Sequence, residues 1–350
     1  MGTASIDPAE RVDRLVDEDG EVRVGVFSEP IAEVNYRDYR LLDPFGRRRG
    51  RWARRFGFNQ FQFTGGLSEG LVFGCAIADM KIAGTAFVYC YDPRTRRFAE
   101  QSFRRPFGVG LHLDQTPEHG GARFEGGRNR ITMSATETPR QRRLAADLAC
   151  GLRIDATLDE ADPAIEPMRV CTRAGATGWV YARKTAGVPA SGTVVWDGAT
   201  YDLRALGVYG HHDWSAGYMR RETFWNWGCL SGRLPDGRAV GLNVSCGVNE
   251  TSFTENCFWL DGRLHKLDTV HFEYDRRELA RPWRLSSFDG RLKLEFRPEG
   301  AHAEKVNAWV LASNFNQLFG RYHGWLETAA GERMGIDGML GYVESHYAKW

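Results

Sequence analysis

The stretch Gly192-Thr-Val-Val-Trp-Asp-Gly-Ala-Thr-Tyr-Asp-Leu203 places an Asp-Gly pair between two runs rich in β-branched and aromatic residues. An Asp-Gly pair suits a two-residue type I′ turn, because both central residues of that turn need a positive φ angle. Residues that branch at Cβ or carry rings favour strands on either side of such a turn. The stretch therefore predicts a tight β-hairpin.

Five other Asp-Gly pairs extend this prediction along the chain. They lie at residues 19–20, 236–237, 261–262, 289–290 and 337–338. The even positions from Leu148 to Leu158 are apolar or small, and a period of two residues is typical of a strand with one buried face. Helical patterns are confined to residues 1–17 and 140–149. Many strands at short spacing predict an all-β fold of antiparallel, barrel-like halves.

A glycine-containing, strand-poor stretch at residues 186–192 divides the chain. It predicts an N-terminal half of residues 1–190 and a C-terminal half of residues 191–350. A closed barrel removes exposed sheet edges, and an eight-stranded barrel has room for one small ligand.

The composition excludes several classes of protein. The chain has 350 residues, of which 42% are hydrophobic, and its formal net charge is +1. Near-neutrality removes the electrostatic attraction on which most nucleic-acid binders depend, so no nucleic-acid partner is expected. No apolar run is long enough to span a membrane, and the N-terminus lacks the apolar core of a secretory signal. We therefore expect a cytoplasmic protein.

One basic run, Arg47–Arg55, stands out from this neutral background. It fits either a peripheral contact with anionic head groups or a solvated connector. An interaction module that uses this run is one class of function that the sequence leaves open.

The seven cysteines are spread singly along the chain, and no Cys-x-x-Cys pair occurs. Their odd number and their apolar neighbours predict reduced, mostly buried thiols and no structural metal site. The chain also lacks a phosphate-binding P-loop, a Gly-x-Ser-x-Gly motif and a Gly-x-Gly-x-x-Gly motif after a strand. We therefore expect neither a metal nor a cofactor.

Residues 207–232 hold the densest set of chemical groups, with two histidines, one Asp, one Glu and three tryptophans. If this segment is a strand, His211 and Asp213 share one face. A carboxyl group among tryptophans loses water, which raises its pKa and allows it to stay protonated near neutrality. Such an acid can protonate a carbon–carbon double bond, and tryptophan rings can stabilise the resulting cation. The alternative is a turn that Asp213 caps, with the tryptophans in the core.

Several segments resemble a known family. Phe58–Phe63, Gly74–Lys81, His211–Trp214 and Asn243–Asn256, together with the closing His346–Trp350, are similar to the signature of the bacterial domain-of-unknown-function family 2804. The resemblance covers nearly the whole chain. It implies a fold but no activity.

A more distant resemblance is to the carotenoid 1,2-hydratase (hydroxyneurosporene synthase) family. There an acidic residue precedes a Trp, and a Trp-x-Trp strand, an Asp-Gly hairpin and a return strand follow. Asp213-Trp214, Trp225-Asn-Trp227, Asp236-Gly237 and Gly241–Val244 match that order. The chain departs from the pattern because His211 stands where the relatives have Asp, and Asp213 stands where they have Glu.

This resemblance implies two lipocalin-like antiparallel β-barrels packed together, with little helix. It also implies a hydratase, cyclase or isomerase that acts on an apolar polyene without metal or redox cofactor. The role of an acid carries over to Asp213, and a place in the pocket carries over to Trp214, Trp225 and Trp227.

The sequence thus predicts an enzyme that acts on a double bond of a lipid or isoprenoid by hydration, cyclisation or isomerisation. Asp213 is the expected acid, and His211 is expected to tune it or to position water. The expected ligand-binding residues are Trp214, Trp225, Trp227, Glu222, Asn243 and Glu255. The alternative is a non-catalytic, lipocalin-like carrier for the same apolar ligand.

Overall fold

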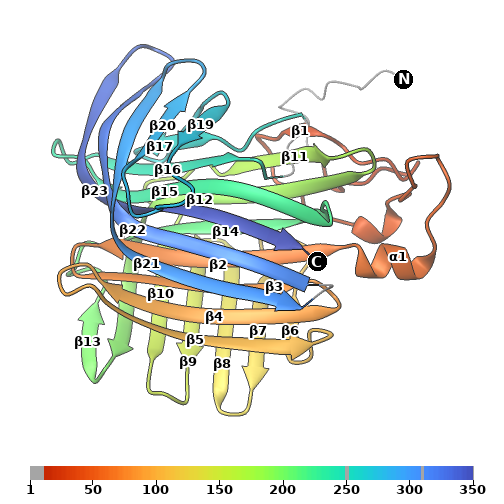
Figure 1. Ribbon diagram of the computed structural model, residues 1–350, viewed down its shortest axis with the longest axis horizontal. Coiled ribbons are helices and arrows are strands. Elements are labelled where there is room, and N and C mark those ends of the chain that lie inside the picture. The colour runs from red at the N-terminus through yellow and green to blue at the C-terminus, as the bar shows by residue number, and fades with distance from the viewer. Residues whose placement is uncertain (1–11, 249–251, 309–310, 350) are drawn as a thin grey trace.

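The computed structural model describes residues 12–248, 252–308 and 311–349, and over these ranges nearly all regular structure is β-strand (Figure 1). The exceptions are one helical turn, η1 (Tyr36–Asp38), and one short helix, α1 (Arg51–Phe56). The strands form two antiparallel sheets, each of which curls into a half-barrel. The prediction of an all-β fold with two lipocalin-like halves and little helix is confirmed.

The first sheet has fourteen strands and contains the N-terminal part of the chain. Its main path runs in the order β5 (Arg97–Pro106), β4 (Ala83–Asp92), β3 (Leu71–Asp79), β2 (Asn59–Ser68), β14 (Tyr209–Tyr218), β12 (Gly178–Trp196), β10 (Arg153–Asp159), β9 (Arg140–Asp147), β8 (Asn129–Glu137), β7 (Gly121–Gly126) and β6 (Leu111–Leu113). Two further strands, β11 (Met168–Ala174) and β13 (Ala199–Asp202), pair with β12, and β1 (Gly25–Val26) pairs with β11.

The second sheet has nine strands. Its order is β18 (Arg263–Lys266), β17 (Cys257–Leu260), β16 (Ala239–Cys246), β15 (Glu222–Arg233), β23 (Arg333–Lys349), β22 (Leu311–Glu327), β21 (Leu292–Ala308), β20 (Trp283–Ser287) and β19 (Val270–Glu273). Figure 1 shows β21, β22 and β23 as long blue strands that run across the middle of the molecule.

The long strand β12 bends where it meets the second sheet. Gly187 has a φ of +73° at a register shift between Ala186 and Val188, so the strand carries a β-bulge there. A Cβ on Gly187 would lie 2.8 Å from the backbone of Gly241, and the Gly187 amide donates to Ser231 Oγ at 3.0 Å. A residue without a side chain therefore lets the two sheets approach closely at this point.

Each half has an apolar core, Cys257 and Trp259 of the second sheet contribute to the core of the first half, and an aromatic layer joins the halves. Leu144 and Phe73 belong to the core of the first half, whereas buried side chains such as Trp283 form that of the second. Between the sheets, the rings of Tyr91 and Phe319 stack at 4.4 Å. We call this layer the aromatic layer; its buried members include Phe63, Tyr89, Tyr91, Trp227, Phe319 and Tyr342.

The Asp-Gly pairs behave as predicted at most places. Asp197-Gly198 and Asp261-Gly262 both have positive φ at the two positions and close the β12–β13 and β17–β18 hairpins. The pair at Asp337-Gly338 is different, because it lies inside β23. There Gly338 forms a bulge opposite Tyr322 and His323, so the prediction of a hairpin turn was wrong at this position.

The helix predicted at residues 140–149 is also wrong. Arg140–Asp147 is β9, which pairs with β8 on one side and β10 on the other. Leu144 and Ala146 are buried on alternate positions, so burial in the sheet overrides a short helical pattern. Residues 1–11 of the other predicted helix, at 1–17, lie outside the described ranges, and no helix is assigned at 12–17.

The chain passes from the first sheet to the second between Tyr218 and Glu222. The predicted division at 190/191 lies within β12, which pairs in the first sheet both before and after this point. The division into two domains stays a prediction. Neither helix of the described ranges is long and apolar enough to cross a membrane.

Candidate functional site

Strands β12 and β14 are neighbours in the first sheet and present two different faces. Lys184 pairs in register with Asp213, so their side chains lie next to each other on one face. The residues beside them in the sequence, Arg183 and His212, therefore point to the other face. Lys184 and Asp213 face the second half of the molecule, whereas Arg183 and His212 face the interior of the first.

Lys184 is the centre of the charged group between the halves. Its Nζ lies 2.9 Å from Asp213 Oδ2 and 2.6 Å from Glu255 Oε1. The side chain of Lys184 is 6% exposed and that of Glu255 is 8% exposed, whereas Asp213 keeps 15% of its surface open. Asp213 is thus the member of this group that water-sized molecules reach most easily.

The second sheet holds Glu255 in place. Trp227 Nε1 donates to Asn243 Oδ1 at 2.7 Å, and Asn243 Nδ2 donates to the Glu255 carbonyl at 3.0 Å. The Lys184 ammonium lies 5.8 Å from the centre of the Trp227 ring, within reach of a cation–π contact. The structure therefore brings Trp227, Asn243 and Glu255 together with Asp213, although Asp213 and Glu255 are 42 positions apart in the sequence.

A third carboxyl group, that of Glu344, lies close enough to influence Asp213 and Lys184 electrostatically. Gln317 Nε2 donates to Glu344 Oε1 at 2.8 Å, and Trp225 Nε1 lies 3.4 Å from Oε2. Burial raises the pKa of Glu344 to about 7. This carboxyl group can therefore gain or lose a proton near neutral pH. We call Lys184, Asp213, Glu255 and Glu344 the acid–lysine cluster.

The pKa of Asp213 is also raised. Burial is the main cause, and the nearby carboxyl of Glu255 adds to it, while Lys184 and the hydroxyl of Ser215 act in the opposite direction. Ser215 Oγ donates to Asp213 Oδ1 at 2.9 Å. Lys184 stays charged, because Asp213 and Glu255 together outweigh the effect of burial and raise its pKa.

His211 shares the face of Asp213, as the alternation predicts, but its contacts are aromatic. Its Nε2 contacts the Tyr342 hydroxyl, and its ring stacks on Phe63 at 5.5 Å. Burial lowers the pKa of His211 to about 3, so the ring is neutral. Its Nδ1 is buried and has no hydrogen-bond partner among the described residues.

Two of the predicted ligand-binding residues lie elsewhere. Trp214 faces away from Asp213 and packs at 6.1 Å against Tyr181, in a separate aromatic core with the N-terminal segment. Glu222 is 56% exposed at the start of β15 and pairs with Lys349 at 3.1 Å. The strand period explains the position of Trp214, since consecutive residues of a strand point to opposite faces.

The sequence reasoning missed Lys184, Glu344 and Gln317. A signal for Lys184 was present, since an Arg-Lys pair interrupts the apolar run Trp179–Ala182 and Ala186–Val188. Charged residues are almost never fully buried unless they are paired, so such a pair predicts partners elsewhere in the chain. Glu344 likewise follows the apolar residues Tyr342 and Val343.

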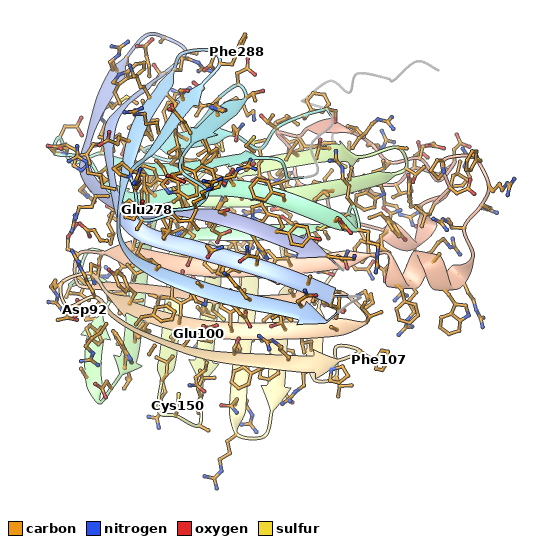
Figure 2. The ribbon with its side chains drawn as sticks, in the orientation of Figure 1. Asp92, Glu100, Phe107, Cys150, Glu278 and Phe288 are labelled. Atoms are coloured by element: carbon orange, nitrogen blue, oxygen red, sulfur yellow. The ribbon has the colours of Figure 1, made fainter. Side chains whose placement is uncertain are left out.

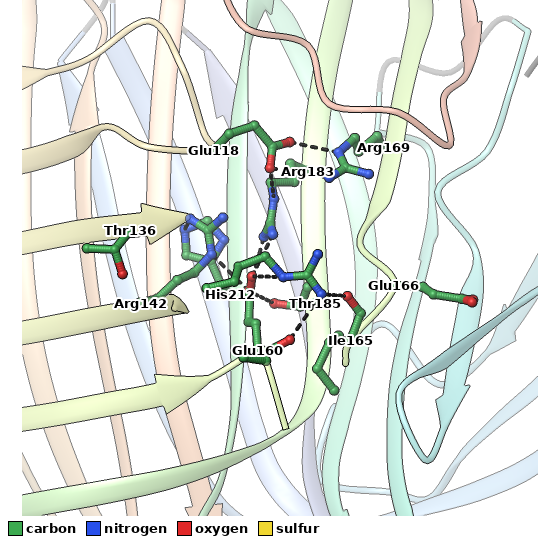
Figure 3. A network of polar contacts seen from close by, with 12 residues as sticks. Glu118, Thr136, Arg142, Glu160, Ile165, Glu166, Arg169, Arg183, Thr185 and His212 are labelled. Carbon is green, nitrogen blue, oxygen red and sulfur yellow. Dashed lines mark hydrogen bonds and ion pairs between the residues drawn. The ribbon is translucent and has the colours of Figure 1, made fainter. Parts of the chain in front are cut away.

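A second buried charged group lies on the opposite face of β12 (Figure 3). Arg183 Nη2 lies 2.6 Å from Glu160 Oε2, and Arg183 Nε lies 3.2 Å from Glu118 Oε2. Arg142 binds Glu160 at 2.9 Å and Arg169 binds Glu118 at 2.7 Å. We call these five residues the arginine cluster; its side chains are at most 5% exposed.

The arginine cluster holds its carboxylates ionised. Burial alone would raise the pKa of Glu118, but Arg183 and Arg169 outweigh burial and lower it to about 2. Burial is likewise outweighed at Glu160, whose pKa is lowered well below the usual range by Arg142 and Arg183. Neither carboxylate can exchange a proton near neutral pH, so this cluster is built for structure.

No group of three or more His, Cys, Asp or Glu side chains is arranged to hold a metal ion within the ranges that the structure describes. Independence from a cofactor stays a prediction. Five of the cysteines are buried free thiols, whereas Cys150 is free and exposed. Figure 2 places Cys150 at the outer end of the first half.

Solved structures share this fold at low sequence identity. An AttH protein from Nitrosomonas europaea matches with a TM-score of 0.51 and 14% identity, over 82% of this chain and 92% of its own. A structure of CghA with Sch210972 matches with a TM-score of 0.52 and 11% identity, over 83% and 88%. Kievitone hydratase from Nectria haematococca matches with a TM-score of 0.50 and 10% identity, over 83% and 89%.

These structures are of the carotenoid hydratase-like double-lipocalin type, which confirms the resemblance in fold. Among curated proteins, none matches the sequence significantly. The profile of the family described as Domain of unknown function (DUF2804) matches residues 7–350, nearly the whole chain. The chain belongs to the DUF2804 family.

Proposed function

We propose that this protein is an enzyme that protonates a carbon–carbon double bond of an apolar, lipid- or isoprenoid-like substrate without a cofactor. Hydration, cyclisation and isomerisation all start with this step. The observation that supports the proposal is the excess of acid in the acid–lysine cluster, where Lys184 pairs with two buried carboxyl groups and a third, that of Glu344, lies within electrostatic range.

The charge balance indicates where the proton is held. Lys184 touches both Asp213 and Glu255 but neutralises only one negative charge. A second buried carboxylate would remain uncompensated, which is costly in a site with little water. The raised pKa of Asp213 favours this residue as the proton carrier, and Glu344 provides a second group that titrates near neutrality.

The aromatic layer, to which Trp227 of the site belongs, suits an apolar substrate. Phe61, Phe87, Phe98 and Trp225 are only partly buried where they pack on the aromatic layer. An apolar chain that covers these rings would gain about 25 cal/mol for each Å² of apolar surface removed from water. The faces of Trp225 and Trp227 would stabilise a cation by about 0.5–2 kcal/mol.

The proposed hydration consumes no net proton, because the proton that Asp213 gives is replaced by one from water. The π electrons of the double bond take the proton of Asp213, which forms a C–H bond and leaves a cation on the neighbouring carbon. The oxygen of a water molecule then forms a C–O bond and returns a proton to the Asp213 carboxylate. Cyclisation and isomerisation differ only in what quenches the cation, either another double bond followed by proton loss or proton loss alone.

The experiment measures deuterium on carbon. The purified protein is incubated in D₂O with the lipids that co-purify with it and with a panel of acyclic polyenes, and the products are analysed by mass spectrometry. All three reactions leave deuterium at a carbon atom. We expect Asp213→Asn to reduce incorporation by about 10²–10⁴-fold, as for the loss of a general acid, and the exposed Glu222→Gln to leave it unchanged.

The competing function is that of a carrier for an apolar ligand, which the aromatic layer alone would also support. A carrier returns its ligand unchanged from D₂O, and Asp213→Asn still binds it. That result would reject the enzyme and retain the carrier.

A further inference from the structure

The segment Phe45–Phe56 combines positive charge with exposed rings, and we call it the arginine–aromatic patch. It contains Arg47, Arg48, Arg49, Arg51, Arg54 and Arg55 and no acidic residue. Figure 1 shows α1, which belongs to the patch, on a lobe that projects from the end of the strands. Arg48, Arg49 and Arg54 also line a hollow of about 130 Å³, together with Arg40 and Leu41.

The charge of the patch is not compensated locally. None of its six arginines forms an ion pair with a carboxylate of the described residues, whereas Arg40 beside it pairs with Glu21. The nearest acid in the sequence, Asp43, accepts the backbone amides of Phe45 and Arg47 at 2.9 Å. With a net charge of only +1 for the whole chain, this patch is a local concentration of positive charge.

Three of the large apolar side chains that the structure exposes lie in this one segment. Phe45 is 85% exposed, Trp52 is 61% exposed and Phe56 is 36% exposed. Phe107 and Phe288 are exposed as well, but Figure 2 shows that they stand far from each other. Single exposed rings need no explanation, whereas a group of them marks a contact surface.

We propose that the arginine–aromatic patch docks the protein on the surface of an anionic lipid bilayer. Arginine side chains near the bilayer are attracted by anionic head groups, and Trp and Phe insert at the boundary between head groups and acyl chains. The patch presents both the arginines and the exposed aromatic rings on one projecting lobe. The proposal goes beyond the proposed function and does not depend on it, because docking is measured without a substrate.

The aromatic contacts favour a bilayer over the other common polyanion, single-stranded RNA. Bases need open ring faces for stacking. The Trp52 ring already contacts the Arg51 guanidinium at 5.2 Å and the Phe56 ring at 5.9 Å, with the two rings nearly parallel. The exposed surface that remains suits insertion among lipid chains better than stacking on bases.

The test is co-sedimentation of the full chain with vesicles of phosphatidylcholine, with and without phosphatidylglycerol. We expect binding only to the anionic vesicles at about 0.1 M salt, and loss of most binding at about 1 M salt, where the screening length falls from about 10 Å to about 3 Å. The triple variant Arg48→Gln/Arg49→Gln/Arg55→Gln should bind about 10²-fold more weakly, since each arginine near the surface contributes about fivefold.

Two further variants make the result specific to the patch. Phe45→Ala/Trp52→Ala should weaken binding by about tenfold at every salt concentration, because it removes the apolar contribution. Arg123→Gln/Arg128→Gln/Arg130→Gln removes the same charge from exposed positions on the β7–β8 hairpin and should bind as the unchanged protein does.

The proposal is overturned if neutral and anionic vesicles bind equally, if neither binds, or if the hairpin variant loses as much binding as the patch variant. Tight binding of a single-stranded RNA oligonucleotide by a protein that leaves the anionic vesicles unbound would assign the patch to nucleic acid instead.

Discussion

The acid–lysine cluster and the arginine cluster meet β12 on its opposite faces, through Lys184 and Arg183, but their carboxyl groups have opposite pKa shifts. On one face Lys184 pairs with Asp213 and Glu255, Glu344 lies within electrostatic range of Lys184, and the pKa values of Asp213 and Glu344 are raised. On the other face three buried arginines surround two acids, and the pKa values of Glu118 and Glu160 are lowered. Burial is common to both clusters, so the ratio of cations to acids decides the direction.

This difference in pKa distinguishes a structural cluster from a cluster that can exchange protons. A carboxylate that several guanidinium groups hold ionised has no proton to give and acts as a fixed charge. A buried carboxyl group with too little positive charge around it has a raised pKa, and one whose pKa approaches neutrality can transfer a proton. The contrast predicts that the same type of substitution, an acid replaced by its amide, has different consequences on the two faces.

The largest effect on stability is expected at Glu160. Glu160→Gln leaves Arg142 and Arg183 buried with too little negative charge, and breaking a buried ion pair in this way costs about 3–5 kcal/mol. The free energy of unfolding, measured by denaturant titration at neutral pH, should fall by this amount. A loss below about 1 kcal/mol would show that the arginine cluster is not a structural unit and would remove the contrast.

A smaller, pH-dependent effect is expected at Glu344. Its folded-state pKa of about 7 lies above the unfolded value of 4.5, so its contribution to stability is fully present below pH 4.5 and is lost as the pH rises through 7. The total is on the order of 3 kcal/mol at 1.36 kcal/mol per pKa unit. The amide in the variant Glu344→Gln does not titrate. As the pH is raised from about 4.5 to 7, the unchanged protein therefore loses stability that the variant keeps, and the free energy of unfolding of the variant should rise relative to that of the unchanged protein.

The measurement is the difference in unfolding free energy between the two proteins across this pH range. The readout is the change of this difference with pH, and not its size at one pH, because the amide also changes the hydrogen bonds to Gln317 and Trp225. A constant difference from pH 4.5 to pH 8 would contradict a raised pKa for Glu344.

The smallest effect on stability is expected at Asp213. If this residue carries a proton, Asp213→Asn resembles it closely, and Lys184 keeps Glu255 as its partner. The free energy of unfolding at about pH 6 should then change by no more than about 1 kcal/mol. The surface variant Glu222→Gln, which loses only an exposed pair, sets the background at about 0.5 kcal/mol.

A loss at Asp213 as large as that expected at Glu160 would show that Asp213 is an ionised structural partner of Lys184. Both clusters would then hold ionised, structural carboxylates, and Glu344 would replace Asp213 as the proposed acid.

The amino-acid sequence by itself determined the local geometry of this protein. Asp197-Gly198 and Asp261-Gly262 close hairpins because their φ angles are set within two residues. The two-residue period placed His211 and Asp213 on one face. The same local reasoning failed at Gly338 and at residues 140–147, where pairing with distant strands decides between a turn and a bulge, or between a helix and a strand.

Only the tertiary structure decided which charges meet. Lys184, Asp213, Glu255 and Glu344 come from four separate segments, and no local pattern counts the acids and cations that a fold gathers in one place. A pKa depends on burial and on neighbouring charges within a few ångströms. Both are properties of the packed sheets, and for this reason the sequence indicated Asp213 and Glu255 as site residues but not Lys184 or Glu344.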